Sequence, residues 1–401
     1  MHKEKVVLAY SGGLDTSIMI PWLKEHYDCD VVAMCADLGQ GKEIDGLKDK
    51  AIQTGACSVY IEDLRDIFIR DYIFPTMQAG AIYEGKYLLG TSFGRPLIAK
   101  RQVEIARKEK ASMVAHGATG KGNDQVRFEL AFMALAPDLK IIAPWKDEKW
   151  DLHSREACID YADQHQIPIV QSKKRIYSED ANIWHISHEG GELEDPMIQA
   201  GEGVFSYSSP LKKASDQGED VTIGFESGIP ISINDDLMMP VDLLTRLNEI
   251  GAKHAIGQVD MVENRLVGMK SRGVYETPGG TLLYAAHQYL ESLVLDRDTM
   301  HYKQKLGLEY ADLVYDGRWF CPLREAMDAF VQSTQKKVTG VVTLHCYKGN
   351  IVPVGYASDY SLYDSELASF SDSALYDQKD ATGFIRLYGL PMKVQGMVDR
   401  K

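Results

Sequence analysis

Several features that would mark a membrane, secreted or zinc-binding protein are absent from the sequence. No apolar run reaches the roughly 18 residues that a membrane-spanning helix needs. Only residues 6–10 are apolar after the charged start, which is too short for the core of a signal peptide. The six cysteines include no C-x-x-C pair, so reduced thiols are favoured over zinc ligands or disulfides. We therefore expect a cytoplasmic protein with no membrane partner.

Positive charge is also scarce. The chain has 44 Lys and Arg against 58 Asp and Glu, a net charge of −14, and no run of basic residues is longer than the three at 173–175, with a pair at 336–337. Because nucleic-acid binding usually requires a basic face, we expect no nucleic-acid partner. The length of 401 residues, of which 45% are hydrophobic, is typical of a globular enzyme with two or three domains.

The most informative stretch is the first apolar segment and the turn that follows it. Residues 6–10 are apolar without alternation, which predicts a strand buried on both faces of a parallel sheet. A Ser-Gly-Gly-Leu-Asp-Thr-Ser turn at 11–17 then leads into a helical pattern. The free N–H groups and positive dipole of a helix start favour phosphate binding there. The spacing matches neither a Walker A loop nor a Rossmann motif, and an ordinary capped turn is the alternative.

Residues 1–170 alternate between strand and helix patterns, which predicts an α/β domain with a doubly wound, mostly parallel sheet. We expect further strands at 29–36, 57–61, 112–115 and 139–143, and helices at 42–54, 64–72, 94–110 and 124–135. Ligands of such sheets bind at the carboxyl ends of the strands. The glycine-rich loop at 116–124 falls at such an end and predicts a second wall of the site, with a flexible surface loop as the alternative.

The pattern changes at residue 171, where we expect an α+β domain that extends to residue 361. Predicted hairpins cover 221–233 and 338–356, and predicted helices cover 240–250, 282–295 and 322–331, with Gly251 ending the first of these helices. For residues 362–401 we expect a short helix with Leu362, Leu367 and Phe370 on one side, followed by a tail whose apolar segment, 384–392, is too hydrophobic to remain free. We expect this tail to pack onto another subunit as an oligomerisation arm.

Residues 9–17 resemble the SGGxDxS signature of the ATP-pyrophosphatase family, which cleaves ATP between its α and β phosphates. Residues 87–92, 116–128 and 262–278, with shorter stretches at 185–187 and 380–384, resemble the argininosuccinate synthase family over nearly the full length. That resemblance implies a cytoplasmic homotetrameric ligase of arginine biosynthesis and the urea cycle. It would join citrulline to aspartate through a citrullyl-adenylate, with ATP as co-substrate accompanied by Mg²⁺, releasing AMP and pyrophosphate. The second domain would be a synthetase and multimerisation domain.

The resemblance also assigns functional residues by position. It implies ATP binding by Ala9, Tyr10, Ser11, Gly12, Gly13, Leu14, Asp15, Thr16, Ser17, Ala36 and Gly117. It implies citrulline binding by Tyr87, Ser92, Asn123, Arg127, Ser178, Ser187, Glu263 and Tyr275, and aspartate binding by Thr119, Asn123 and Asp124.

Asp15 and His116 are the predicted catalytic residues. Asp15 would orient pyrophosphate through Mg²⁺. The alternative is that its negative charge only stabilises the positive N-terminal end of the helix dipole. His116 would act on the α-phosphate, or would cap a strand end. His185 and His188 are spaced like a metal pair but have no third ligand near them in the sequence, so no resident metal site is predicted.

Two other functions remain open at this point. One is an ATP-pyrophosphatase-type adenylating ligase with a different acceptor, and the other is a non-catalytic nucleotide-binding protein. A glutaminase domain would mark GMP synthetases and a basic face would mark the tRNA-modifying members, and neither is evident in the sequence. The chemistry of the predicted residues suits adenylation, because glycines, hydroxyls and amides can position substrates without a covalent intermediate.

Overall fold

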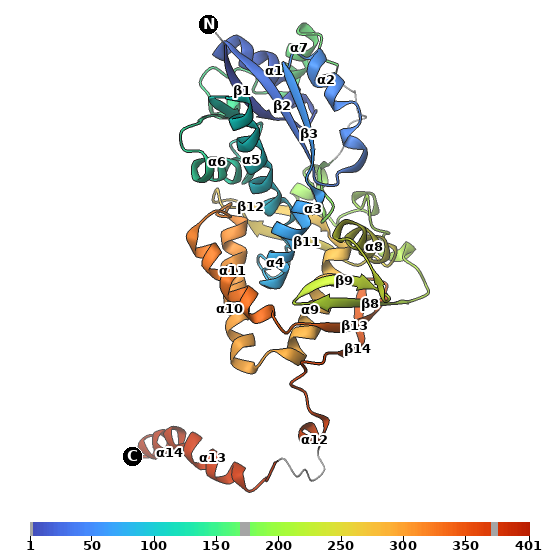
Figure 1. Ribbon diagram of the computed structural model, residues 1–401, viewed down its shortest axis with the longest axis vertical. Coiled ribbons are helices and arrows are strands. Elements are labelled where there is room, and N and C mark those ends of the chain that lie inside the picture. The colour runs from blue at the N-terminus through green and yellow to red at the C-terminus, as the bar shows by residue number, and fades with distance from the viewer. Residues whose placement is uncertain (1–2, 169–176, 370–375) are drawn as a thin grey trace.

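The computed structural model describes residues 3–168, 177–369 and 376–401, arranged as two domains and an arm (Figure 1). The N-terminal domain is built on a five-stranded parallel sheet in the order β3-β2-β1-β4-β5. Its strands are β1 (Glu4–Ala9), β2 (Cys29–Asp37), β3 (Ser58–Asp63), β4 (Met113–Ala115) and β5 (Lys140–Ile142). The predicted doubly wound sheet is confirmed, with β1 at its centre.

Helices cover both faces of this sheet. Val6 and Leu8 of β1 pack with α1 (Leu14–Tyr27), α2 (Leu47–Gln53) and α7 (Arg155–Gln164). Val7 points to the opposite face, which is covered by α5 (Gly90–Glu109) and α6 (Asp124–Leu135). The side chains of Val6, Val7 and Leu8 have no solvent exposure, which confirms that the strand is buried on both faces.

The connection from β3 to α5 begins with a continuous helical run from Arg65 to Gln78. It comprises α3 (Arg65–Phe68), a π-helical turn η2 (Ile69–Ile73) and α4 (Phe74–Gln78), so the helix expected over 64–72 is present and extends further. In contrast, the helix expected over 42–54 divides into a 3₁₀ turn η1 (Gly41–Ile44) and α2, because Gly46 between them adopts φ +75°. A further 3₁₀ turn, η3 (Pro144–Lys146), follows β5.

The second domain contains two antiparallel sheets. One has the order β10-β9-β8-β13-β14 and contains both predicted hairpins; the other, which was not predicted, has the order β11-β12-β7-β6. The strands are β6 (Ser178–Ala181), β7 (Ile186–Glu189), β8 (Glu219–Glu226), β9 (Ile229–Ile233), β10 (Asp236–Leu237), β11 (Gln258–Asn264), β12 (Lys270–Glu276), β13 (Gly340–Tyr347) and β14 (Asn350–Ala357). The predicted boundary at residues 170 and 171 lies outside the described residues.

The second domain also contains four helices: α8 (Pro240–Lys253), α9 (Pro278–Val294), α10 (Arg297–Tyr315) and α11 (Pro322–Gln335). Helices α8 and α9 pack on the β8-containing sheet, whereas α10 and α11 pack on each other and against α5 and α4. Short 3₁₀ turns are η4 (Gly191–Glu194), η5 (Glu202–Val204) and η6 (Leu211–Lys213). The prediction that Gly251 ends α8 was wrong, because the helix continues to Lys253. A Cβ on Gly251 would lie 2.7 Å from Cβ of Pro278, so this glycine serves the close approach of α9.

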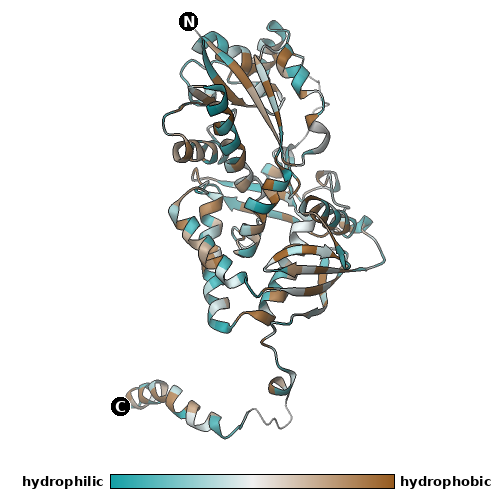
Figure 2. Cartoon of the chain, viewed as in Figure 1, coloured by the Kyte–Doolittle hydropathy of each residue, from teal (hydrophilic) through white to brown (hydrophobic). Residues whose placement is uncertain are grey.

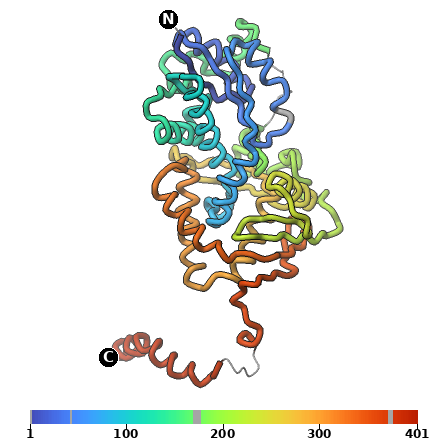
Figure 3. Tube along the Cα trace, in the orientation of Figure 1, coloured from blue at the N-terminus to red at the C-terminus, as the bar shows by residue number. Residues whose placement is uncertain are grey.

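The C-terminal arm extends away from both domains (Figures 1 and 3). It contains α12 (Ser365–Ala368), α13 (Asp380–Tyr388) and α14 (Leu390–Val398). Its apolar side chains are exposed, with Leu387 at 77% and Met392 at 78%, and Figure 2 shows hydrophobic residues along these helices. Phe370, which was expected in the short helix, lies outside the described residues. Within the described ranges, no helix is both long and apolar enough to cross a membrane.

Candidate active site

The glycine loop follows β1 at the carboxyl edge of the sheet and ends at α1. Gly12 adopts φ +77°, and a Cβ there would lie 2.1 Å from Cδ2 of Leu47, so only glycine fits between the loop and α2. The hydroxyls of Ser11 and Thr16 lie 3.1 Å apart. Helix α1 begins after Gly13 without a side-chain cap. The uncapped start leaves backbone donors for an anion, which favours phosphate binding over the ordinary capped turn.

Asp15 adds a carboxylate to the first turn of α1, where the side chain is exposed. Because the side chain is exposed, it is available to solvent-borne ligands such as a hydrated cation. Partial desolvation by the surrounding chain raises the pKa of the carboxyl group above its usual value, while Arg155 lowers it.

The loop at 116–124 touches the glycine loop, as expected for a second wall. A Cβ on Gly117 would lie 3.2 Å from Cγ2 of Thr16 and 3.2 Å from Sδ of Met19, so the two loops are in close contact. Ala36, near the end of the neighbouring strand β2, is 8% exposed at the same edge of the sheet. Three segments with predicted ATP-binding residues thus meet at the carboxyl ends of β1, β2 and β4.

His116 lies at the end of β4 and is fully buried. Its Nε2 is 3.3 Å from Oε1 of Glu129, and its Nδ1 accepts a hydrogen bond from the Ala118 N–H at 3.3 Å. The ring also stacks on Phe128. Because protein partners occupy both ring nitrogens, this geometry favours the strand-end cap, and a catalytic role for His116 stays a prediction.

Asn123 joins the loop to the second domain. Its Nδ2 donates to the Tyr315 hydroxyl at 2.9 Å, and its Oδ1 accepts from the Leu266 N–H at 3.0 Å. Thr119, in contrast, is exposed. The nitrogen and the oxygen of the Asn123 side-chain amide are therefore both fixed by residues about 140 to 190 positions later in the chain.

Arg127, one turn further along α6, is 4% exposed. Its Nη1 donates to Oδ1 of Asp124 at 3.0 Å. Burial alone would raise the pKa of Asp124, but Arg95 and Arg127 hold the pKa of this carboxyl below its usual value. Arg95 also donates to Oδ2 of Asp180 at 2.6 Å, so it links the predicted aspartate-binding residue to β6.

The second domain contributes a buried aromatic and acidic wall. Tyr275 of β12 donates to Oε2 of Glu263 of β11 at 3.1 Å, and the Tyr87 ring centroid lies 4.5 Å from that of Tyr275. Burial raises the pKa of Glu263 above its usual value and that of Tyr87 to about 12. Ser187 pairs in register with Tyr275 across the sheet.

Two predicted serines differ in their surroundings. Ser92 is fully buried in the first turn of α5, and its Oγ has no hydrogen-bond partner among the described residues. A buried hydroxyl without a partner carries a cost that a polar ligand would remove. Ser178 is exposed and pairs with Glu189 in register, so the structure does not join it to the other predicted citrulline residues.

His185 and His188 have separate partners. His185 Nε2 is 3.0 Å from the Thr91 hydroxyl, and burial lowers the pKa of His185 to about 4. His188 Nε2 is 2.8 Å from Oε1 of the fully buried Glu276. Where the structure describes the chain, no group of three or more His, Cys, Asp or Glu side chains is arranged to hold a metal ion.

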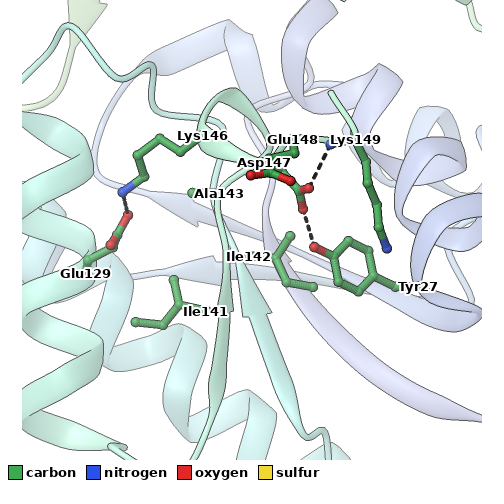
Figure 4. Close-up of a pocket in the computed structure, with 9 residues that line it drawn as sticks. All are labelled: Tyr27, Glu129, Ile141, Ile142, Ala143, Lys146, Asp147, Glu148 and Lys149. Carbon is green, nitrogen blue, oxygen red and sulfur yellow. Dashed lines mark hydrogen bonds and ion pairs between the residues drawn. The ribbon is translucent and has the colours of Figure 1, made fainter. Parts of the chain in front are cut away.

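A separate cavity of about 430 Å³ lies beside the edge strand β5 (Figure 4). It is lined by Tyr27, Glu129, Ile141, Ile142, Ala143, Lys146, Asp147, Glu148 and Lys149. None of the predicted site residues lines it. Its connection to them is Glu129, whose carboxylate bonds Lys146 inside the cavity and contacts His116 outside it.

Two site residues escaped the sequence analysis, Arg95 and Tyr315. Tyr315 ends α10, a helix that was not predicted, and it contacts both Asn123 and Arg127. No local motif marks it, because its importance comes from a contact across the domains. Arg95 lies three residues after the 87–92 segment, and this proximity to a predicted site segment was the available signal.

The parallel sheet with its uncapped glycine loop, joined through Asn123 to a buried cluster of charged and aromatic side chains, indicates a nucleotide-binding enzyme. Family models described as the arginosuccinate synthase N-terminal HUP domain and C-terminal domain match residues 5–168 and 177–395. The chain belongs to the argininosuccinate synthase family.

Curated relatives agree over the whole length. The chain is 63% identical to the argininosuccinate synthase of Desulforamulus reducens and 61% identical to that of Carboxydothermus hydrogenoformans, in both cases over 99% of this chain and 98% of the relative. Among solved structures, a U34-tRNA thiolase from Methanococcus maripaludis matches 43% of this chain and 60% of its own, with 19% identity and a TM-score of only 0.28.

Proposed function

We propose that the protein ligates L-citrulline and L-aspartate to argininosuccinate, using ATP and releasing AMP and pyrophosphate. The observation that carries this proposal is the 116–124 loop. It touches the glycine loop through Gly117 and Thr16, and it reaches the second domain through the hydrogen bond from Asn123 to Tyr315. A phosphate-binding end and an amino-acid-binding end are thereby held at a fixed separation, as adenylation requires.

ATP would bind along the loop from Ala9 to Ser17, with Ala36 and Gly117 at its sides. Mg²⁺ fits this end, because oxygen donors suit it and the Asp15 carboxylate is exposed in the first turn of α1. When bound, Mg²⁺ neutralises phosphate charge. Asp15 would hold it beside the pyrophosphate group.

Citrulline would bind against the buried side chains of Tyr87, Asn123, Arg127, Glu263 and Tyr275. The buried guanidinium of Arg127 can pair with the citrulline carboxylate, and the Glu263 carboxylate can accept from its amino group. The tyrosine rings exclude water, which protects a reactive adenylate from hydrolysis. Ser92 offers a hydroxyl without a protein partner, while Ser187 and Ser178 are the further proposed contacts.

Aspartate would bind at Thr119, Asn123 and Asp124, next to citrulline. The ureido oxygen of citrulline would attack the α-phosphorus and pyrophosphate would leave; the aspartate amine would then attack the adenylated carbon and release AMP. The protein contributes positioning and hydrogen-bond donors, each worth several kcal/mol. His116 would stabilise the conformation of the 116–124 loop. We also propose a direct contact with the α-phosphate, which mutation of His116 would test.

The exposed apolar residues of α13 and α14 support an assembly in which the arm packs on another subunit, and we propose a homotetramer working in the cytoplasm.

The function is tested by measuring pyrophosphate release from ATP with each amino acid alone and with both together. We expect release that depends on citrulline, and argininosuccinate only when aspartate is also present. Release without citrulline would favour a different acceptor. No argininosuccinate with both substrates present would contradict the assignment.

A further inference from the structure

The glycine loop contains no lysine, but α2 brings one to it. Leu47 and Lys50 lie one turn apart on this helix and both touch Gly12. The Leu47 side chain fills the space where a Cβ of Gly12 would be, and Lys50 Nζ donates to the Gly12 carbonyl oxygen at 2.6 Å. Helix α2 therefore places an ammonium group against the backbone of the loop.

The charge of Lys50 is not neutralised by the protein around it. No described carboxylate forms an ion pair with Lys50, whereas Lys5 pairs with Glu109 at 2.7 Å and Lys146 pairs with Glu129. The side chain is half-buried, and burial lowers the pKa of Lys50 below the usual lysine value. An ammonium has three donors, and the Gly12 carbonyl uses one of them. The two others are available to an anion.

We propose that Lys50 is a phosphate-binding residue, which contacts the terminal phosphates of ATP and the pyrophosphate that leaves. When the bond between the α-phosphorus and the bridging oxygen breaks, its electron pair goes to pyrophosphate. A fixed ammonium stabilises that charge as it develops. This inference rests on the proposed function, because it takes ATP to be cleaved at this loop.

The competing explanation is that Lys50 only ties α2 to the loop. Lys24 provides a matched control, because its Nζ donates to the Gly55 carbonyl at 3.2 Å, just beyond the other end of α2. Lys24 is exposed and takes no part in the proposed site. Both lysines therefore make one bond to a glycine carbonyl next to α2, and only Lys50 lies at the glycine loop.

The experiment compares the full-length wild type with Lys50→Met, Lys50→Arg and Lys24→Met. Calorimetric titrations with inorganic pyrophosphate plus Mg²⁺, and with citrulline, measure the two ends of the site without turnover. Thermal melting checks that each variant is folded. We expect Lys50→Met to weaken pyrophosphate binding about tenfold or more, since a charge-assisted hydrogen bond is lost. Citrulline binding should change less than about twofold, Lys50→Arg should recover most of the loss, and Lys24→Met should match the wild type.

Pyrophosphate binding by Lys50→Met within about twofold of wild type would overturn the proposal. So would an equal loss in Lys50→Arg and Lys50→Met, or a loss shared by citrulline, because each indicates a structural tie. The binding assay separates this proposal from the proposed function. A wild type that binds pyrophosphate through Lys50 but forms no argininosuccinate would contradict the function alone.

Discussion

Arg127 and Tyr315 are joined by two contacts across the two domains. The Arg127 Nε donates to the Tyr315 carbonyl oxygen at 3.0 Å, and the guanidinium carbon lies 5.0 Å from the centroid of the Tyr315 ring. The arginine is thus held in place by α10 while its Nη1 reaches Asp124. A guanidinium fixed on several sides binds a carboxylate with little loss of side-chain entropy.

Arg127→Ala should raise the KM for citrulline about 30-fold or more while the KM for ATP changes about twofold at most, because a buried charge-assisted pair with the citrulline carboxylate is lost. Steady-state pyrophosphate release measures both constants. Arg107→Ala, which breaks an exposed pair with Asp138, is the matched control and should leave both unchanged. Equal effects on citrulline and ATP would remove Arg127 from the citrulline site.

Tyr315→Phe removes the hydroxyl that accepts from Asn123 and leaves a buried amide donor without its partner. The expected cost is about 1–2 kcal/mol, or roughly tenfold in KM, for both citrulline and aspartate, since Asn123 is proposed to contact both. The ATP constant should not move. A variant with unchanged amino-acid constants would show that Asn123 does not depend on this bond.

The binding of citrulline should weaken on acidification. Burial raises the pKa of Glu263 above 4.5, so its carboxylate is protonated at a higher pH than that of an ordinary glutamate. As the pH falls through this raised pKa, the acceptor for the citrulline amino group is lost and the KM rises. Glu263→Gln should have a higher KM at neutral pH and a flatter acidic profile. The same acidic rise in both proteins would assign the titration to another group.

Gly12→Ala should destabilise the loop. The substitution combines a left-handed backbone with a Cβ 2.1 Å from Leu47, and we expect a loss of about 1–3 kcal/mol together with weaker ATP binding. Differential scanning calorimetry and ATP titration measure the two effects. Gly203→Ala is the control, because nothing lies within 4 Å of its Cβ position. A melting temperature equal to that of the control would contradict the close packing of α2 on the loop.

Deletion of residues 362–401 should lower the oligomeric state, because the exposed apolar residues of α13 and α14 have no partner surface within the two domains. Light scattering gives the mass, and circular dichroism checks that the remaining domains are folded. An unchanged mass would rule out the arm as the means of assembly.

The sequence predicted the elements whose cause is local. Three consecutive apolar residues, Val6, Val7 and Leu8, suffice for a strand covered on both faces, and each packs as expected. The residues at which helices end were harder to predict, because they depend on contacts with residues far away in the sequence. Gly251 is a residue type that often ends a helix, but here its lack of a side chain allows Pro278 of α9 to pack closely against α8.

The candidate site shows the same difference between local features and features that depend on distant contacts. Residues in contiguous motifs, such as Asn123 and Arg127, could be assigned from the resemblance. Tyr315 and Lys50 could not, because each acts through a bond to a residue of another motif, across 192 and 38 positions respectively. Only the folded chain brings these pairs together.

The division of the site between the domains also bears on how the chain is made. During synthesis the glycine loop emerges first, while Glu263, Tyr275 and Tyr315 follow much later. A nascent N-terminal domain has the glycine loop but lacks the residues proposed to hold the amino-acid substrates. We therefore expect activation of citrulline to wait until the second domain has folded.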